Sequence, residues 1–173
     1  MPTRHPARLH LKKLPAKPAR TPLQRAIALL ARREHSAAEL TAKLTGSDLT
    51  QQQAAQVVAQ LAADGLQSDL RFAESFTRSR AEKWGRPRIL HELARKGIDQ
   101  ETAAKGVDVV LGCTDQSDEC SRALEVLRKR FASAADDPRQ RQQQWRFLQA
   151  RGFAADITAK ALRSFAEQEE SHS

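Results

Sequence analysis

The chain has 173 residues, a formal net charge of +8 and no tyrosine. Abundant Ala, Leu, Gln, Arg and Glu, with few strand-forming runs, predict an all-α protein and disfavour a β-sheet. No window approaches the roughly 18 uninterrupted apolar residues of a membrane span, and residues 1–20 lack the apolar core of a secretory signal. We therefore expect a cytoplasmic protein with no membrane partner.

The positive charge is unevenly distributed along the chain. Residues 1–20 contain six basic residues and no acidic one. Two internal segments, 71–96 and 120–151, each hold eight basic and three acidic residues, whereas the segment between them, 97–119, holds one basic and six acidic residues. Basic segments of this kind suit a polyanion or an acidic protein surface, although solvated helix faces give the same pattern.

The first part of the chain predicts a tail followed by three helices. Residues 1–21 are rich in Pro, Arg and Lys, and we expect a disordered basic tail that adds nonspecific affinity for nucleic acid. A first three-helix repeat is expected over 22–67, with its first helix running through Arg33. Ser36 to Glu39 and Thr50 to Gln53 each predict a capping box that opens a helix.

A second repeat is expected over 68–112 on the same plan. Ser68 predicts the cap of a helix that carries Phe72 and Phe76 and ends near Trp84. A middle helix then begins around Pro87 and stops at Gly97, and Asp99 caps the third helix.

A third repeat is expected over 113–166, after an acidic linker around 112–118. Its first helix includes Phe131, its middle helix runs from Asp137-Pro138 to Gly152, and its last helix precedes a disordered acidic end at 167–173.

The three middle helices share a leucine followed three residues later by a base. These pairs are Leu40 with Lys43, Leu93 with Lys96, and Leu148 with Arg151. The leucine can enter a three-helix core while the base reaches its rim. Units of this size are marginally stable alone, so neighbouring units are expected to stack in tandem.

Motifs for catalysis, phosphate-binding loops and metal sites are missing from the sequence, and we expect neither an enzyme nor a cofactor. His35 and His91 are interpreted as surface or capping residues, and Cys113 and Cys120 as ordinary reduced thiols. The aromatic residues fall at apolar helical positions, which favours core packing over a base-stacking platform. They are Phe72, Phe76, Phe131, Trp145, Phe147, Phe153 and Phe165.

The segment from Asp69 to Ile98, with its Arg71-Phe72-Ala-Glu and Gly85-Arg-Pro-Arg88-Ile motifs, resembles the RecX family of modulators of the RecA recombinase. The resemblance covers residues 23–166, including Phe147 to Phe153. It implies a curved, elongated array of repeats that lodges as a monomer in the groove of the RecA–DNA filament. The implied role is a mainly inhibitory one, on ATP hydrolysis, strand exchange and filament extension, in homologous recombination, DNA repair and the SOS response.

The basic positions in and around these motifs are the expected contacts with RecA or with single- or double-stranded DNA, the DNA contacts being nonspecific. They are Arg71, Arg78, Arg80, Lys83, Arg86, Arg88, Arg95, Lys96, Arg128, Lys129, Arg130, Arg146 and Arg151. The alternative is a helix-turn-helix transcriptional regulator, but segments 54–62 and 103–111, the third helices, hold almost no side chains that read base edges.

Overall fold

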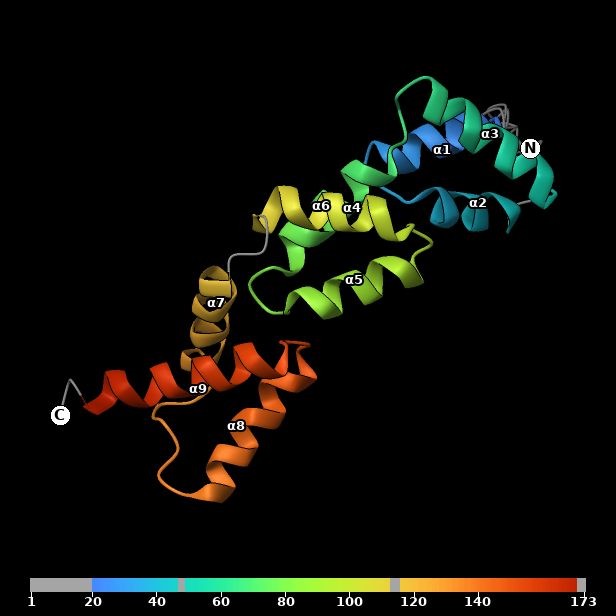
Figure 1. Cartoon of the computed structure of the whole chain (residues 1–173). Helices are drawn as coiled ribbons and strands as arrows, with labels where there is room; N and C mark the ends of the chain where they lie inside the picture. The colour runs from blue at the N-terminus through green and yellow to red at the C-terminus, as the bar shows by residue number, and fades with distance from the viewer. Residues whose placement is uncertain (1–19, 47–48, 113–115, 171–173) are drawn as a thin grey trace, which may run out of the picture.

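Nine α-helices and no strand make up the part of the chain that this computed structural model describes, residues 20–46, 49–112 and 116–170. The helices follow one another in three groups of three along an elongated path, with α1 to α3 at one extreme and α8 and α9 at the other (Figure 1). The predicted all-α class and tandem three-helix organisation are confirmed. The basic tail predicted at the start of the chain falls outside the described residues except at its last two positions. The helices are α1 (Pro22–Leu30), α2 (Ala37–Thr45), α3 (Gln51–Ala63), α4 (Asp69–Arg80), α5 (Arg86–Arg95), α6 (Gln100–Leu111), α7 (Gln116–Arg128), α8 (Pro138–Ala150) and α9 (Ala155–Glu170).

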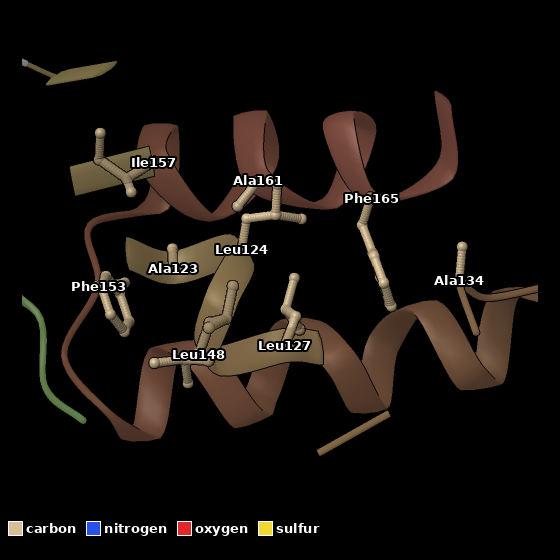
Figure 2. Close-up of a cluster of buried hydrophobic side chains, with 10 residues drawn as sticks. Ala123, Leu124, Leu127, Ala134, Leu148, Phe153, Ile157, Ala161 and Phe165 are labelled. Carbon is tan, nitrogen blue, oxygen red and sulfur yellow. The ribbon is translucent and has the colours of Figure 1, made fainter. Parts of the chain in front are cut away.

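Each group of three helices encloses a hydrophobic core of its own. The leucines predicted from the middle helices, Leu40, Leu93 and Leu148, are completely buried, one in each core. In the third core, Leu148 of α8 and Phe165 of α9 converge on side chains of α7 (Figure 2). Burial of one such side chain contributes about 1.5–3 kcal/mol, so each leucine anchors its middle helix to the two flanking helices.

Several helix ends differ from those predicted. The first helix stops at Leu30 instead of Arg33, and the Arg33 side chain donates to the Glu34 carbonyl and the Glu39 carboxylate. The helix α4 stops at Arg80 rather than near Trp84, and Phe131 lies beyond the end of α7.

The two acidic segments of the third repeat also differ from the prediction. Helix α7 begins inside the segment predicted as a linker, and its first turn contains Asp118 and Glu119, whose negative charge stabilises a helix N-terminus. Helix α9 continues through Glu170, so the prediction of disorder is wrong for residues 167–170, while residues 171–173 fall outside the described part.

Most predicted helix starts are confirmed by their caps. The complete capping box of Thr50 and Gln53 is present, and the side chains of Ser68, Asp99 and Asp137 each accept an amide of the following turn. Such a cap contributes about 0.5–2 kcal/mol to helix stability.

Consecutive repeats meet through their middle helices. The C-terminal end of the middle helix of one repeat contacts the N-terminal start of the middle helix of the repeat before it. The Ser36 hydroxyl, at the start of α2, donates to the carbonyl of Lys96 at the end of α5 over 2.8 Å. The Gly85 amide, at the start of α5, donates to the carbonyl of Arg151 at the end of α8 over 3.0 Å. Carbonyls in the last turn of a helix have no partner within that helix. The first repeat therefore supplies a hydrogen-bond donor to a free carbonyl of the second repeat, and the second repeat supplies one to the third.

A glycine makes each of these end contacts possible. Gly97 and Gly152 follow the ends of α5 and α8 with φ of +79° and +75°, a conformation that side chains disfavour. A Cβ on Gly97 would lie 2.6 Å from the Ala38 Cβ, and one on Gly152 would overlap the Arg88 Cβ. The corresponding position of the first repeat holds the buried Leu44.

This geometry predicts unequal costs for two alanine substitutions. Gly65 also has a positive φ, +70°, but a Cβ there meets no atom within 4 Å. Gly65→Ala should therefore cost only the backbone strain, about 1–2 kcal/mol. Gly152→Ala should lower the free energy of unfolding further, because it adds a clash with the Arg88 side chain and backbone. Urea denaturation of both variants measures the difference, and equal losses would show that the contact between α5 and α8 does not depend on close approach.

Candidate functional site

The contact between the first two repeats contains a cluster of charged groups around Glu39. The Glu39 carboxylate lies 2.7 Å from the Lys96 ammonium group, 3.1 Å from the Arg33 guanidinium group and 3.2 Å from Nδ1 of His35. The Ser36 side chain accepts the Glu39 amide as predicted, but the Glu39 side chain does not return to the Ser36 amide. Glu39 instead joins α2 to the end of α5, so the second half of the predicted capping box is wrong.

Two residues of this cluster, Glu39 and His35, have pKa values below their ordinary values. Burial alone would raise the pKa of Glu39, but the hydrogen bonds from Lys96 and Arg33 outweigh burial and hold it below its ordinary value. Burial, followed by the charge of Arg33, lowers the pKa of His35 against the opposing effect of Glu39. His35 is 3% exposed and its carbonyl accepts the Gln67 amide group, so the prediction of a surface or capping histidine is wrong.

The lowered pKa of His35 predicts that acid destabilises this contact. Below the ordinary histidine pKa of about 6.5 the unfolded chain binds a proton that the folded protein resists, so the free energy of unfolding should fall between about pH 7.5 and 5.5. The lowered pKa of Glu39 adds a further loss only at more acidic pH. Urea denaturation at several pH values should show a shallower slope for His35→Asn. His91→Asn, at an exposed position outside the cluster, is the matched control substitution, and equal slopes for wild type and His35→Asn would contradict the assignment.

Two of the predicted contact residues, Arg71 and Arg86, form ion pairs within the molecule. The Arg71 guanidinium group lies 3.0 Å from Glu34 and also donates to the carbonyls of Gly65 and Leu66. Arg86 pairs with Asp108, and its amide donates to the Glu119 carboxylate of the third repeat. Both residues therefore hold helices and repeats together, and charge reversal at either would disturb the fold as well as any binding surface.

Five of the predicted bases and four half-buried aromatic rings form a series across the second and third repeats. We call this series the basic–aromatic row. Its members are Lys96, Phe76, Arg80, Trp84, Arg88, Arg151, Phe147, Phe131 and Arg130.

In the second repeat, the row runs from the end of α5 to the start of the same helix. The Lys96 ammonium group and the Arg80 guanidinium group each lie 5.7 Å from the centre of the Phe76 ring. Arg80 also lies 5.0 Å from the centre of the Trp84 ring system, and Arg88 lies 4.5 Å from it. A cation over an aromatic face gains about 0.5–2 kcal/mol, so the rings hold these charged groups in place.

The row continues into the third repeat where α5 contacts α8. The Arg88 guanidinium group donates to the Ala150 carbonyl, and the next base, Arg151, lies 3.6 Å from the centre of the Phe147 ring. Phe147 meets Phe131 edge to face at 5.1 Å, and Arg130 lies 5.5 Å from the Phe131 ring centre.

Positive charges gather at this part of the row. Burial, followed by the charges of Arg88 and Arg130, lowers the pKa of Arg151, although an arginine stays protonated at neutral pH. Farther along the row, Nε of Arg80 is buried without a hydrogen-bond partner, and the groove that Arg80 lines contains both basic side chains, Arg33 and Lys96, and the acidic Glu34.

The remaining predicted bases are exposed on helix faces and helix ends. Arg78 and Arg95 have side chains 60% and 67% exposed and pair with glutamates one turn away on their own helices. Such exposed pairs contribute little to stability, so these charges remain accessible to a partner. The exposed set is Arg78, Lys83, Arg95, Arg128, Lys129 and Arg146.

The sequence prediction that the aromatic residues pack in the cores is confirmed for six of the seven, and Trp145 is the exception. Phe72, Phe153 and Phe165 are buried in the cores as predicted. Phe76, Phe131 and Phe147 are only half-buried and have bases over or beside their rings, and Trp145 is also half-buried. Trp84, four residues after Arg80 and four before Arg88, is the one signal in the sequence that could have indicated the row.

Other features of the described residues bear on the class of protein. Among residues 20–46, 49–112 and 116–170, no group of three or more His, Cys, Asp or Glu side chains could hold a metal ion. No helix in that part of the chain is long and apolar enough to cross a membrane. Burial raises the pKa of the Cys120 thiol beside the third core, which disfavours the reactive thiolate, whereas Cys113 falls outside the described residues.

The architecture defines a tandem three-helix-repeat protein with a basic–aromatic row across two of its repeats. Three family models match the chain in order: the first three-helix domain of RecX over residues 23–61, the second over 68–107 and the third over 117–162. The chain therefore belongs to the RecX family.

Individual relatives agree with the family models. The chain is 37% identical over 147 residues to the regulatory protein RecX of Neisseria meningitidis serogroup C, covering 85% of this chain and 92% of the relative. It is 40% identical over 143 residues to that of Chromohalobacter salexigens, covering 82% and 91%. The crystal structure of RecX from Lactobacillus salivarius shares the fold, with a TM-score of 0.70 at 19% identity over 83% of this chain and 94% of that one.

Proposed function

We propose that this protein regulates the RecA recombinase, mainly as an inhibitor, by binding the RecA–DNA filament. Membership of the RecX family supports the assignment of the partner. The observation that carries the binding mode is the basic–aromatic row, which presents Arg80, Arg88 and Arg151 in fixed positions across two repeats. Fixed basic groups are suited to a partner whose negative charges are themselves regularly spaced, as in a nucleoprotein filament.

The stacked arginines remain able to bind anions. A guanidinium group that lies over an aromatic ring keeps its N–H groups in the plane, where they can donate to phosphate or carboxylate oxygens. Stacking also reduces the side-chain entropy that binding would otherwise cost, because the guanidinium group is already positioned. The row therefore supports contact with DNA phosphates, with acidic RecA side chains, or with both at once.

Binding along the filament would modulate ATP hydrolysis, strand exchange and filament extension by occupying surface that these processes need. The protein would act in the cytoplasm as a monomer, with the tail of residues 1–20 adding sequence-independent affinity for DNA through its six bases. A helix-turn-helix repressor is a poorer fit, because α3 has no base and the single base of α6, Lys105, is paired with Glu101.

A titration tests the proposed regulation. We expect the full chain, added to RecA hydrolysing ATP on single-stranded DNA, to lower the rate at equimolar or smaller amounts. A form lacking residues 1–20 should inhibit with the same limiting effect but at a higher concentration, and its half-maximal concentration should depend less steeply on salt, because fewer phosphate contacts are made. If neither form lowers the rate, the proposed function is wrong, and a footprint on one DNA sequence would favour the repressor instead.

A second experiment tests the row. Arg80→Gln combined with Arg130→Gln should raise the concentration needed for half-maximal inhibition about tenfold or more, since a hydrogen bond to a charged group is worth about 1.5–3 kcal/mol. The matched control is Arg78→Gln with Arg95→Gln, which removes the same charge from exposed positions of the second repeat outside the row.

The control should change the inhibitory concentration less than the row variant does. Both variants should keep the helical circular dichroism of the parent, because neither removes a side chain from a core. Equal losses in the two variants would show that only total charge matters and that the row is not the contact surface.

A further inference from the structure

A surface groove in the third repeat lies on the outer side of α8 and α9 and contains Trp145. The groove has a volume of about 350 Å³ and is lined by Ala135, Arg141, Gln144, Trp145, Ala159, Leu162, Arg163 and Ala166. Trp145 is half-buried and is not among the residues that form or cover the third core. The largest side chain of α8 therefore lines a surface groove instead of filling the core of the repeat.

Helix α9 contributes an apolar face to this groove in addition to the face that enters the core. Ile157, Ala161 and Phe165 are buried in the core. Ala159, Leu162 and Ala166 line the groove at a spacing of three and four residues, and Leu162 and Ala166 also pack against the edge of the core. Small residues such as alanine allow another backbone to approach closely. A groove with this spacing fits the apolar side of a helix, whose anchors recur at the same intervals.

Two arginines flank the groove, and no acidic residue is among the lining residues whose side chains the structure describes. Arg141 and Arg163 are both exposed, and neither side chain forms a hydrogen bond or ion pair with any residue in the described part of the chain. Glu167, one turn after Arg163, is not among the lining residues. The lining Gln144 is already satisfied, because its amide donates to the Ser133 carbonyl over 3.0 Å. The available polar groups of the groove are thus positive.

We infer that this groove docks an acidic amphipathic helix of a partner protein, with apolar side chains against Trp145 and Leu162 and carboxylates paired with Arg141 and Arg163. Charge complementarity selects the acidic partner, and the same positive charge disfavours the chain's own basic tail as the occupant. Tryptophan and arginine together are the side chains that most often dominate the energy of protein interfaces.

Single-stranded DNA is the competing occupant, and the lining favours the helix. A DNA-binding channel combines several stacked rings with a line of bases along the strand, whereas the apolar lining of this groove is one ring with aliphatic and small side chains. This inference is independent of the proposed action on RecA, because it concerns a different surface from the basic–aromatic row.

The test is selection from a displayed library of random peptides about four helical turns long, with the immobilised full chain as the target. We expect enriched peptides to carry apolar residues at helical spacing flanked by Asp or Glu. The variant Arg141→Glu/Arg163→Glu should bind these peptides about tenfold or more weakly, as expected when an attractive charge pair becomes repulsive. Trp145→Ala should also weaken binding, with circular dichroism as the check on folding.

The matched control is Arg139→Glu/Arg146→Glu, which makes the same charge change at exposed positions of α8 outside the groove. The inference stands if only the groove variants lose peptide binding. It is overturned if the control loses as much, or if enriched peptides show no acidic preference.

Two further measurements separate the other occupants. Selective loss of oligo-dT binding in the groove variant, without loss of peptide binding, would make the groove a nucleic-acid site and overturn the inference. Self-association in sedimentation that disappears in the groove variant would make a second copy the occupant, and would overturn the inference as well.

Discussion

The relative arrangement of the three repeats depends on one kind of contact. The end of the middle helix of one repeat meets the start of the middle helix of the repeat before it. At both places a backbone carbonyl that its own helix leaves unpaired is satisfied by the neighbouring repeat, from Ser36 in one case and Gly85 in the other. Close approach needs a residue without a Cβ, and Gly97 and Gly152 supply it. Because the hydrophobic cores are separate, these few polar contacts fix the relative orientation of the repeats.

The same contacts divide the basic residues into two groups with different roles. Arg71 and Lys96 stabilise the first contact through Glu34 and Glu39, and Arg86 and Arg88 stabilise the second. A base held in this way is positioned for a partner, as Arg88 is over Trp84, but it cannot be removed without also loosening the array. Bases on open helix faces contribute charge with little structural cost, which is why they serve as controls.

The sequence-based predictions agree with the structure where residues close in the sequence determine the local structure. Helical periodicity and caps such as Thr50 and Asp137 depend on local patterns, and the core leucines follow from the repeat. The predictions failed where a distant partner decides the outcome. Glu39 has the spacing of a capping residue but is drawn to Lys96, 57 residues away, and Trp145 has the position of a core residue but lines a surface groove. Trp84 between Arg80 and Arg88 is a partial signal for the row, but no single-sequence pattern records such long-range contacts, so the complete row and the Trp145 groove could not be predicted.

Leu44 has a consequence beyond the first repeat. A head-to-tail contact that joins identical surfaces has no natural end, and such contacts between separate molecules produce open filaments. In this chain the buried Leu44 stands where the later repeats have a docking glycine, and α2 continues one residue farther to Thr45. The surface that lets the ends of α5 and α8 dock closely on the preceding repeat is therefore not reproduced at the end of α2.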